Sequence, residues 1–195
     1  MNEFSFPMLY LWRREEADSG GPGRYRGGVG ASSCFIPYDS PLGGVHLVVS
    51  APGKALPLAG GLSGGLPAGT QHDVLLRSTT VRADLAGGHI PSSLAELGGT
   101  PDVLPTHHET ELGEADVYFT HWQGGGGYGD PLLRDPSAVA ADVLAHKVSP
   151  RGATDVYGVV LGTDGTVDDE GTRTRRNALR RIRAGLDDDR TEATA

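Results

Sequence analysis

Short apolar runs separated by turn-forming residues fill the first third of the chain, and this pattern predicts strands. Residues 6–14 form an apolar and aromatic run that leads directly into a glycine-rich loop at residues 18–23. Residues 27–57 alternate apolar runs with proline and glycine, as antiparallel strands joined by turns do. Residues 60–69 hold five glycines and one proline, which predicts a loop.

The middle of the chain predicts one clear strand and one weaker one. Apolar and polar residues alternate over residues 115–122, which predicts a strand with two different faces. One face would carry Val117, Phe119 and His121, and the other Tyr118, Thr120 and Trp122. Residues 73–84 are expected to form another strand or a pair of strands. Residues 87–114 contain many turn formers and little periodicity, so we expect weak structure there.

Helices are expected only in the last third. Asp135 is a suitable N-cap with Pro136 at the first helical position, and the helix should run to about His146. Residues 156–161 predict a buried strand, residues 163–166 a hairpin turn, and residues 171–186 a second helix that is rich in arginine. The apolar face of this second helix is narrow, so we expect it on a surface or at an interface.

The predicted elements together belong to the α+β class. We expect a β-rich mixed domain of short, mainly antiparallel strands with glycine-rich loops and a few peripheral helices over residues 1–186, followed by a disordered tail over residues 187–195. The chain has 195 residues, 30 of them glycine, and 37% of its residues are hydrophobic. This low apolar content favours a chain that completes its core against a partner.

Charge and composition limit the classes of partner. The formal net charge of −8 argues against nucleic acid, because phosphate neutralisation needs a basic face. No apolar stretch approaches the roughly 20 residues that span a bilayer, so we expect a soluble protein and no membrane partner. Cys34 is the only cysteine, which excludes an internal disulfide and fits a reducing cytoplasm. We expect it to be a small buried residue in or near a strand.

Residues 18–30 form the first motif with candidate chemistry. Its glycines would let backbone N–H groups converge on an anion, and Arg24 and Arg26 would add positive charge on one face of an extended segment. A phosphate or carboxylate site is one interpretation. The alternative is a tight structural turn whose arginines bind loop carbonyls, because the motif lacks the Lys-Ser/Thr ending of a P-loop.

The second motif runs from His121 through the four glycines at 124–127 to Tyr128 and Asp130. Successive glycines such as Gly125 and Gly126 permit the close approach of either a ligand or another backbone segment. The sequence does not decide between these two interpretations.

Metal and nucleophile motifs are weak. His107 and His108 are neighbours, and neighbouring side chains of a strand point to opposite faces, so a solvated loop is the simpler interpretation. A zinc or manganese site that uses His108, Glu111 and a distant ligand is the alternative. Cys34 has no recognisable nucleophile signature around it. We therefore assign no catalytic residue, no cofactor-binding residue and no firm metal ligand.

The glycine motifs, taken in order, resemble the hydantoinase B/oxoprolinase family. The two long matches are DSGGPGRYRGG at residues 18–28 and GGGGYGDPLLRDP at residues 124–136. Shorter matches lie at residues 6–11, 60–65, 139–143, 148–149 and 157–160. Family members are usually much longer, and these motifs resemble their C-terminal portion. We therefore expect a naturally split subunit or a trimmed chain, closest to the acetophenone carboxylase-like and N-methylhydantoinase-like B-type subunits.

The resemblance implies a subunit of a multi-subunit ATP-dependent enzyme in the cytoplasm that is inactive alone. Such complexes carboxylate a ketone or hydrolyse a cyclic amide through a phosphorylated intermediate. By the same resemblance, ATP and Mg²⁺ belong to an A-type partner, and Zn²⁺ or Mn²⁺ to an N-terminal B-type fragment. This chain would carry no cofactor itself, and a small molecule would be the substrate of the hetero-oligomer.

Seven residues are candidates to line or support a cleft or interface shared with those partners. They are Arg24, Arg26, His121, Gly125, Gly126, Tyr128 and Asp130. Two other functional classes stay open. One is a non-catalytic scaffold that holds larger subunits together, and the other is a stand-alone module that binds a small anion at Arg24 and Arg26.

Overall fold

The computed structural model describes residue 3 and residues 5–186, so the tail predicted at 187–195 lies outside the described residues. Two groups of elements follow one another along the chain. Strands dominate the first, with β1 Met8–Glu15, β2 Ala31–Pro37, β3 Gly44–Ser50, β4 His72–Arg77, α1 Val81–Ala86, η2 Leu94–Glu96, β5 Thr100–Val103, β6 His107–Gly113 and β7 Val117–His121. The second contains η3 Pro131–Leu133, α2 Pro136–Leu144, α3 Pro150–Asp155, β8 Val160–Leu161, β9 Val167–Asp168 and α4 Asp169–Arg183.

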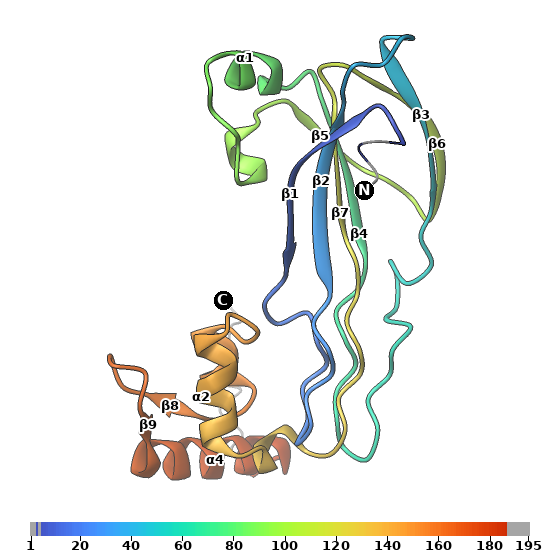
Figure 1. Ribbon diagram of the computed structural model, residues 1–195. Coiled ribbons are helices and arrows are strands. Elements are labelled where there is room, and N and C mark those ends of the chain that lie inside the picture. Colours follow the sequence, from blue (N-terminus) through green and yellow to red (C-terminus); the bar gives the residue numbers. More distant parts are fainter. Residues whose placement is uncertain (1–2, 4, 187–195) are drawn as a thin grey trace, which may run out of the picture.

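A five-stranded antiparallel sheet in the order β1-β2-β7-β4-β5 forms the centre of the molecule (Figure 1). The antiparallel pair β3-β6 packs against one face of it. Apolar residues that alternate along the strands fill the space between the two layers. This core consists of Phe35, Val49, Ala51, Leu75, Leu104, Leu112 and Tyr118. The opposite face of the sheet has its own core, which α1 and the segment around η2 cover at one end of the strands.

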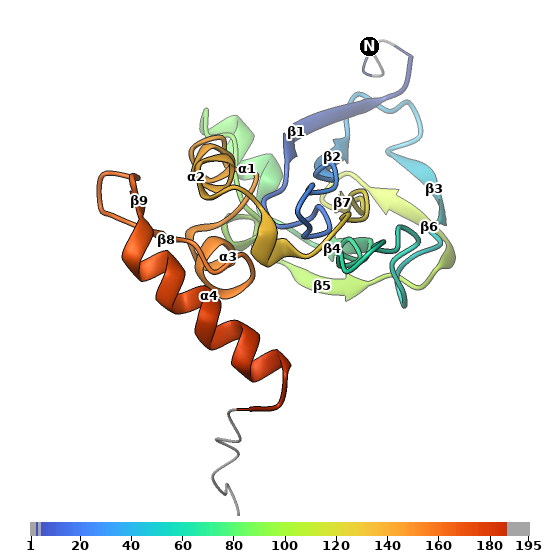
Figure 2. The same cartoon turned by 90° about the horizontal axis from the view of Figure 1, so that it is seen from below.

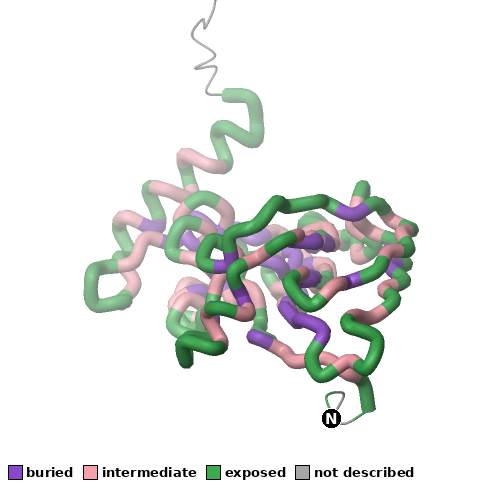
Figure 3. The backbone as a smooth tube through the Cα atoms, turned by 90° about the horizontal axis from the view of Figure 1, so that it is seen from above, coloured by how far each residue is buried: buried purple, intermediate pink, exposed green. Residues whose placement is uncertain are grey.

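The C-terminal elements form a smaller lobe with its own core. Val139, Val148, Ala153, Tyr157 and Val159 are buried together there. Figure 2 shows α4 along the outer side of the lobe, away from the main sheet. Buried residues concentrate in the strands and at the base of the lobe, whereas the far end of α4 is exposed (Figure 3). Among the described helices, none is long and apolar enough to cross a membrane.

The predicted class and most elements are confirmed. The strands at 6–14 and 115–122, the loop at 60–69 and the helix capped by Asp135 are all present. Asp135 Oδ1 accepts the N–H of Ser137 at 2.8 Å, as an N-cap should. Cys34 is fully buried in β2, as expected. The arginine-rich helix is also present, as α4.

Three local predictions were wrong. Residues 81–86 form a helix and not a second strand, because Val81 and Leu85 pack on the same core and lie four residues apart, which is a helical spacing. Residues 87–114 contain β5 and β6, since pairing with β4 and β3 stabilises segments whose own periodicity is weak. In residues 156–161 only Val160–Leu161 is a strand. The preceding helix α3 begins at a Ser149 cap, whose Oγ accepts the N–H of Gly152 at 2.8 Å.

Candidate functional site

Three glycine-rich loops run side by side beyond one end of the main sheet (Figure 1). We call them loop A (residues 18–30), loop B (59–69) and loop C (122–130), and together the glycine bundle. Backbone hydrogen bonds connect each loop to the other two. Their N–H···O distances are 2.8 Å for Gly21 to Gly125, 2.9 Å for Gly125 to Gly28, 2.9 Å for Leu62 to Gly127, 3.0 Å for Gly127 to Leu66 and 2.7 Å for Leu66 to Pro22.

Close backbone packing is the reason that the bundle needs glycine. A Cβ atom placed on Gly126 would lie 1.8 Å from the carbonyl oxygen of Gly60, and one on Gly27 would lie 1.9 Å from that of Gly125. Both distances are far inside van der Waals contact, so no other residue fits without moving the backbone. Of the two interpretations of the tetraglycine run, the structure therefore supports chain-to-chain packing for Gly126.

Arg26 joins the bundle to the C-terminal lobe. Its Nε and Nη2 donate to Oδ2 and Oδ1 of Asp142 at 3.2 and 3.1 Å, and Arg134 Nη2 donates to Oδ2 at 2.8 Å. These side chains are 11–15% exposed, so the three groups form a partly desolvated cluster. Burial alone would raise the pKa of Asp142, but the two guanidinium groups outweigh it and hold the pKa below its usual value. We call Arg26, Arg134 and Asp142 the junction clamp.

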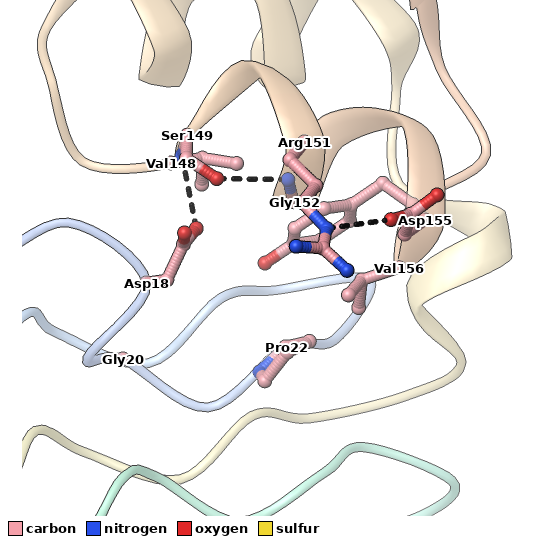
Figure 4. A pocket seen from close by; sticks show the side chains of 10 residues that line it. Asp18, Gly20, Pro22, Val148, Ser149, Arg151, Gly152, Asp155 and Val156 are labelled. Atoms are coloured by element: carbon pink, nitrogen blue, oxygen red, sulfur yellow. Dashed lines mark hydrogen bonds and ion pairs between the residues drawn. The ribbon is translucent and has the colours of Figure 1, made fainter.

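A pocket of about 370 Å³ lies beside the clamp, between loop A and α3, and we call it the junction pocket (Figure 4). Asp18 Oδ1 accepts the backbone N–H of Ser149 at 2.9 Å. On another side, Arg151 Nε contacts Asp155 Oδ2 at 3.2 Å. Charges of both signs therefore line this pocket.

Tyr157 connects the junction pocket to the clamp. Its ring is buried and lines the pocket, and burial raises the pKa of its hydroxyl to about 12. The charges of Arg134 and Arg26 oppose that rise, which places Tyr157 beside the clamp. A neutral phenol next to fixed charges can position a polar ligand but does not act as a base near neutral pH. The pocket can therefore bind and orient a small molecule.

Arg24, Tyr128 and Asp130 meet at the exposed end of the bundle, which we call the loop tip. Arg24 N–H donates to the Gly129 carbonyl at 3.0 Å, and its guanidinium lies 5.7 Å from the ring centroid of Tyr25. The Tyr25 and Tyr128 rings lie 6.3 Å apart and are 61% and 53% exposed. Exposed tyrosines beside an arginine are typical of the centres of protein interfaces.

Asp130 has two partners at the loop tip. Its Oδ1 accepts the N–H of Leu132 and an N–H of Arg183, both at 2.9 Å. The first contact caps η3, and the second ties α4 to loop C. Asp130 therefore organises the tip as well as contributing charge to it.

His121 lies apart from the loop tip, on the main sheet. Its ring stacks on His72 of the neighbouring strand with centroids 6.0 Å apart, and Ser32 is its partner on β2. Burial lowers the pKa of His121, and Glu16 opposes that shift. Among the described residues, its Nε2 is a buried nitrogen without a hydrogen-bond partner.

The proposed metal pair does not come together. His108 and Glu111 are three residues apart on β6, so they point to opposite faces of the strand, with His108 half-buried and Glu111 exposed. Glu111 instead contacts His46 of β3, with Oε1 2.9 Å from Nδ1. No group of three or more potential metal ligands occurs in the described part of the chain. The arrangement in the described residues therefore gives no support to His108 and Glu111 as joint ligands.

The structure separates the seven candidate residues into groups. Arg24, Tyr128 and Asp130 meet at the loop tip, and Gly125 and Gly126 lie inside the bundle. Arg26 belongs to the junction clamp, and His121 lies on the main sheet. The sequence analysis did not identify Asp142 and Tyr157 as site residues. Asp142 is a buried carboxylate that lies one turn after Val139 on the buried face of α2. Acidic residues are rarely buried without a partner, so an aspartate on the apolar face of a predicted helix could have indicated this ion pair.

Comparisons with known proteins agree with these motifs. The family model described as "Hydantoinase B/oxoprolinase" matches residues 1–131. The chain is 33% identical over 210 residues to the acetone carboxylase alpha subunit of Xanthobacter autotrophicus, covering 93% of this chain and 25% of that one. It is 34% identical over 176 residues to the caprolactamase subunit beta of Pseudomonas jessenii, covering 90% and 27%.

A solved structure supports the same likeness. The nucleotide-free structure of acetone carboxylase, from a study of ATP-dependent acetone carboxylation, matches with a TM-score of 0.76 and 30% identity. The match covers 93% of this chain and 26% of that chain. The chain therefore spans about a quarter of the length of each relative that it matches.

Proposed function

Because this chain belongs to the hydantoinase B/oxoprolinase family, we propose that it works as one subunit of an ATP-dependent carboxylase or amide hydrolase complex. Its substrate is a ketone that becomes carboxylated or a cyclic amide that becomes hydrolysed. Transfer of the γ-phosphoryl group of ATP to the carbonyl or amide oxygen would release ADP and make the substrate reactive. A ketone would also lose an α-proton and become an enol phosphate, whose carbon attacks the carboxyl donor as the P–O bond breaks and phosphate leaves. A phosphorylated cyclic amide would accept water at its carbon, and breaking of the C–N bond and hydrolysis of the phosphate bond would release the ring-opened amino acid and phosphate.

One observation carries this proposal. Nine tenths or more of the chain resembles proteins named for an ATP-dependent acetone carboxylation or for a caprolactamase, yet it spans about a quarter of each. We therefore assign ATP and Mg²⁺ to an A-type partner, and Zn²⁺ or Mn²⁺ to an N-terminal B-type fragment. The complex would be a cytoplasmic hetero-oligomer in which this chain alone is inactive.

At the residue level, we assign the loop tip to the partner interface. Arg24 and Tyr128 are exposed there, and Asp130 holds the tip together. Arg26, Gly125 and Gly126 support the tip from inside, and the junction pocket beside Arg26 would face the shared cleft. His121 would support that cleft from the end of β7, next to loop C.

Two other functions account less well for the geometry. A stand-alone anion site that uses Arg24 and Arg26 together is disfavoured, because the Arg26 guanidinium already donates to both carboxylate oxygens of Asp142. A pure scaffold is favoured by one observation, namely that Gly126 serves backbone packing. That observation concerns how the loops are built and does not exclude a ligand at the junction pocket.

The test begins with tagged chain purified from its native host, with mass spectrometry of the proteins that accompany it. Co-purification with an ATP-binding subunit and an N-terminal B-type fragment is the expected result. The purified complex should then hydrolyse ATP when acetone with bicarbonate, or caprolactam, is added. A chain that emerges alone, or a complex whose ATP hydrolysis no ketone or lactam stimulates, contradicts the proposal.

The residue-level assignment needs its own variants. Arg24→Ala and Asp130→Ala should weaken assembly or activity at least about tenfold, as the loss of an interface arginine or a tip-organising carboxylate commonly does. Arg173→Ala is the matched control, because Arg173 is an exposed arginine on α4. If Arg24→Ala and Asp130→Ala both behave like Arg173→Ala, the loop tip is not the interface.

A further inference from the structure

Arginine side chains gather where α4 meets the loop tip. Although the chain has a net charge of −8, six of its 17 basic residues lie within the 15 residues of α4. Arg176, Arg180 and Arg183 follow one another at steps of four and three residues, so they share one face of the helix. Arg183 Nη1 donates to Asp130 Oδ1 at 2.9 Å, which places the C-terminal end of this face at the loop tip.

Arg24 of loop A belongs to the same surface. Arg134 Nη1 donates to the Arg24 carbonyl at 3.1 Å, and Arg176 Nη2 donates to the Arg134 carbonyl at 2.6 Å. Loop A, the segment before α2 and α4 therefore meet at one place. We call Arg24, Arg176, Arg180 and Arg183 the arginine patch.

Most charges of the arginine patch have no counter-charge. Within residues 3 and 5–186, Arg183 is the only member with an ion-pair partner. Arg180 donates to Asn177 Oδ1 at 3.2 Å, and Arg176 donates to two backbone carbonyls. Burial and the charge of Arg180 both lower the pKa of Arg176, as neighbouring guanidinium groups do. The patch therefore attracts negative charge, although the chain as a whole is acidic.

A pocket of about 400 Å³ opens beside the patch, and we call it the tip pocket. Arg24 and Tyr25 line it from loop A, and Leu133 lines it from η3. Asp135 also lines it, but this carboxylate already accepts two hydrogen bonds as the cap of α2. Tyr25 and Leu133 are 61% and 56% exposed, so apolar surface stands open beside the unpaired guanidinium of Arg24.

We propose that the arginine patch and the tip pocket bind an acidic segment of the partner subunit, with carboxylates against the arginines and one apolar side chain in the pocket. A polypeptide fits better than a small anion. Arg176 and Arg183 are about 10 Å apart along the helix axis, so the charges form a line and do not converge on one point. This inference rests on the proposed function, because it identifies the chemistry of the partner that meets the loop tip.

The first test uses a synthetic peptide of glutamates with one central phenylalanine, titrated into the full chain and followed by the chemical shifts of backbone amides. We expect saturable binding whose largest shifts fall at Tyr25, Ala138 and Arg180. A peptide with alanine in place of the phenylalanine should bind about 3- to 10-fold more weakly, because the tip pocket stays empty. Shifts scattered over the surface, or tighter binding of inorganic pyrophosphate at the same residues, would overturn the proposal.

Charge reversal provides a second test. Arg180→Glu should weaken binding of the glutamate peptide at least about tenfold, because it replaces an attraction by a repulsion. Arg173→Glu is the matched control on the same helix. Its arginine lies about 15 Å along the axis from Arg183 and already has Glu170 3.9 Å away, so binding should fall less than about twofold. Melting curves verify that both variants are folded, and Arg180→Ala replaces Arg180→Glu if that variant is not. Equal effects at the two positions contradict the proposal.

The same variants separate this inference from the proposed function. In the complex purified from the native host, Arg180→Glu should reduce the amount of co-purified partner and Arg173→Glu should not. A complex that Arg180→Glu leaves intact contradicts the inference, while the proposed function stands. A wild-type chain that binds the glutamate peptide at the patch but co-purifies with no partner supports the acidic-segment site and contradicts the proposed function.

Discussion

Arg26 and Asp142 are 116 positions apart in the sequence and bind each other through two parallel contacts of 3.2 and 3.1 Å. This ion pair connects the glycine bundle to the first long helix of the C-terminal lobe. Two-point contacts fix orientation as well as distance, because the guanidinium and carboxylate planes must align. The pair therefore sets how the lobe faces loop A, and with it the shape of the junction pocket.

Replacing Asp142 should destabilise the protein strongly. Asp142→Ala leaves Arg26 and Arg134 partly buried without their counter-charge, and we expect the free energy of unfolding to fall by about 3 kcal/mol. Urea denaturation measures this loss. Asp155→Ala is the control, because its pairs with Arg151 and Arg175 are much more exposed, and it should cost less than about 1 kcal/mol. Equal losses in the two variants would argue against the clamp.

Alanine substitution at two glycines of the bundle should change the free energy of unfolding by very different amounts. Gly126→Ala places a methyl group 1.8 Å from the Gly60 carbonyl oxygen and should cost at least about 2–3 kcal/mol of unfolding free energy. Gly28→Ala meets nothing within 4 Å, so it should be neutral or stabilise by less than about 1 kcal/mol. The measurement is the free energy of unfolding of both variants, obtained from thermal and urea denaturation. A tolerated Gly126→Ala would mean that the loops are loosely packed.

His121 should make the protein less stable in mild acid. Burial lowers its pKa in the folded state, so between that value and about 6.5 the unfolded chain binds a proton that the folded chain does not. Stability is therefore lost as the pH falls below about 6.5, and His121→Gln should remove that part of the loss. The measurement is the unfolding free energy of both proteins at pH 7.5 and 5.5.

His46 provides a control of opposite sign. Hydrogen bonding to Glu111 raises its pKa, so its contribution is present at low pH and disappears as the pH rises through the raised value. His46→Gln should therefore lose stability at pH 5.5 and keep it at pH 7.5. If both variants change in the same direction, His121 does not titrate as its buried position requires.

Cys34 should be unreactive in the folded protein. It is fully buried in β2, and burial raises the pKa of its thiol to about 12. Because the thiolate is the reactive form, a thiol reagent at pH 8 should label the native chain negligibly and label it fully in denaturant. Rapid labelling of the native chain would show that local unfolding of β2, which exposes Cys34 to the reagent, requires little free energy.

The sequence predicted those parts of the fold that local chemistry determines. The α2 helix followed from Asp135 and Pro136, and the turn at residues 163–166 separates the strands β8 and β9 as expected. β6 was not predicted, because its sequence alternates histidine, glutamate and threonine without a strong apolar face. Only its seven-residue pairing with β3 makes it a strand, and that pairing cannot be read from local sequence.

The sequence predicted which motifs contribute to the candidate site, but not which residues contact one another there. Residue type and spacing identified Arg24 and Arg26 as a pair, since both follow the same glycines. Two residues apart on an extended segment, they have different partners: Arg26 meets Asp142, while Arg24 lies beside Tyr25 at the tip. Such long-range partners depend on the tertiary fold, so the sequence left the phosphate and structural interpretations open.

The glycine bundle also governs how this chain reaches its native state. Loops A, B and C come from three widely separated parts of the sequence, so loops A and B lack part of their hydrogen-bond partners until loop C has been synthesised. Contacts between distant segments form slowly, because the chain must first lose the entropy of closing long loops. The complete bundle is therefore expected to form late in folding. A newly made chain spends this interval with unpaired glycine-rich segments, which is when a chaperone or an assembling subunit would meet it.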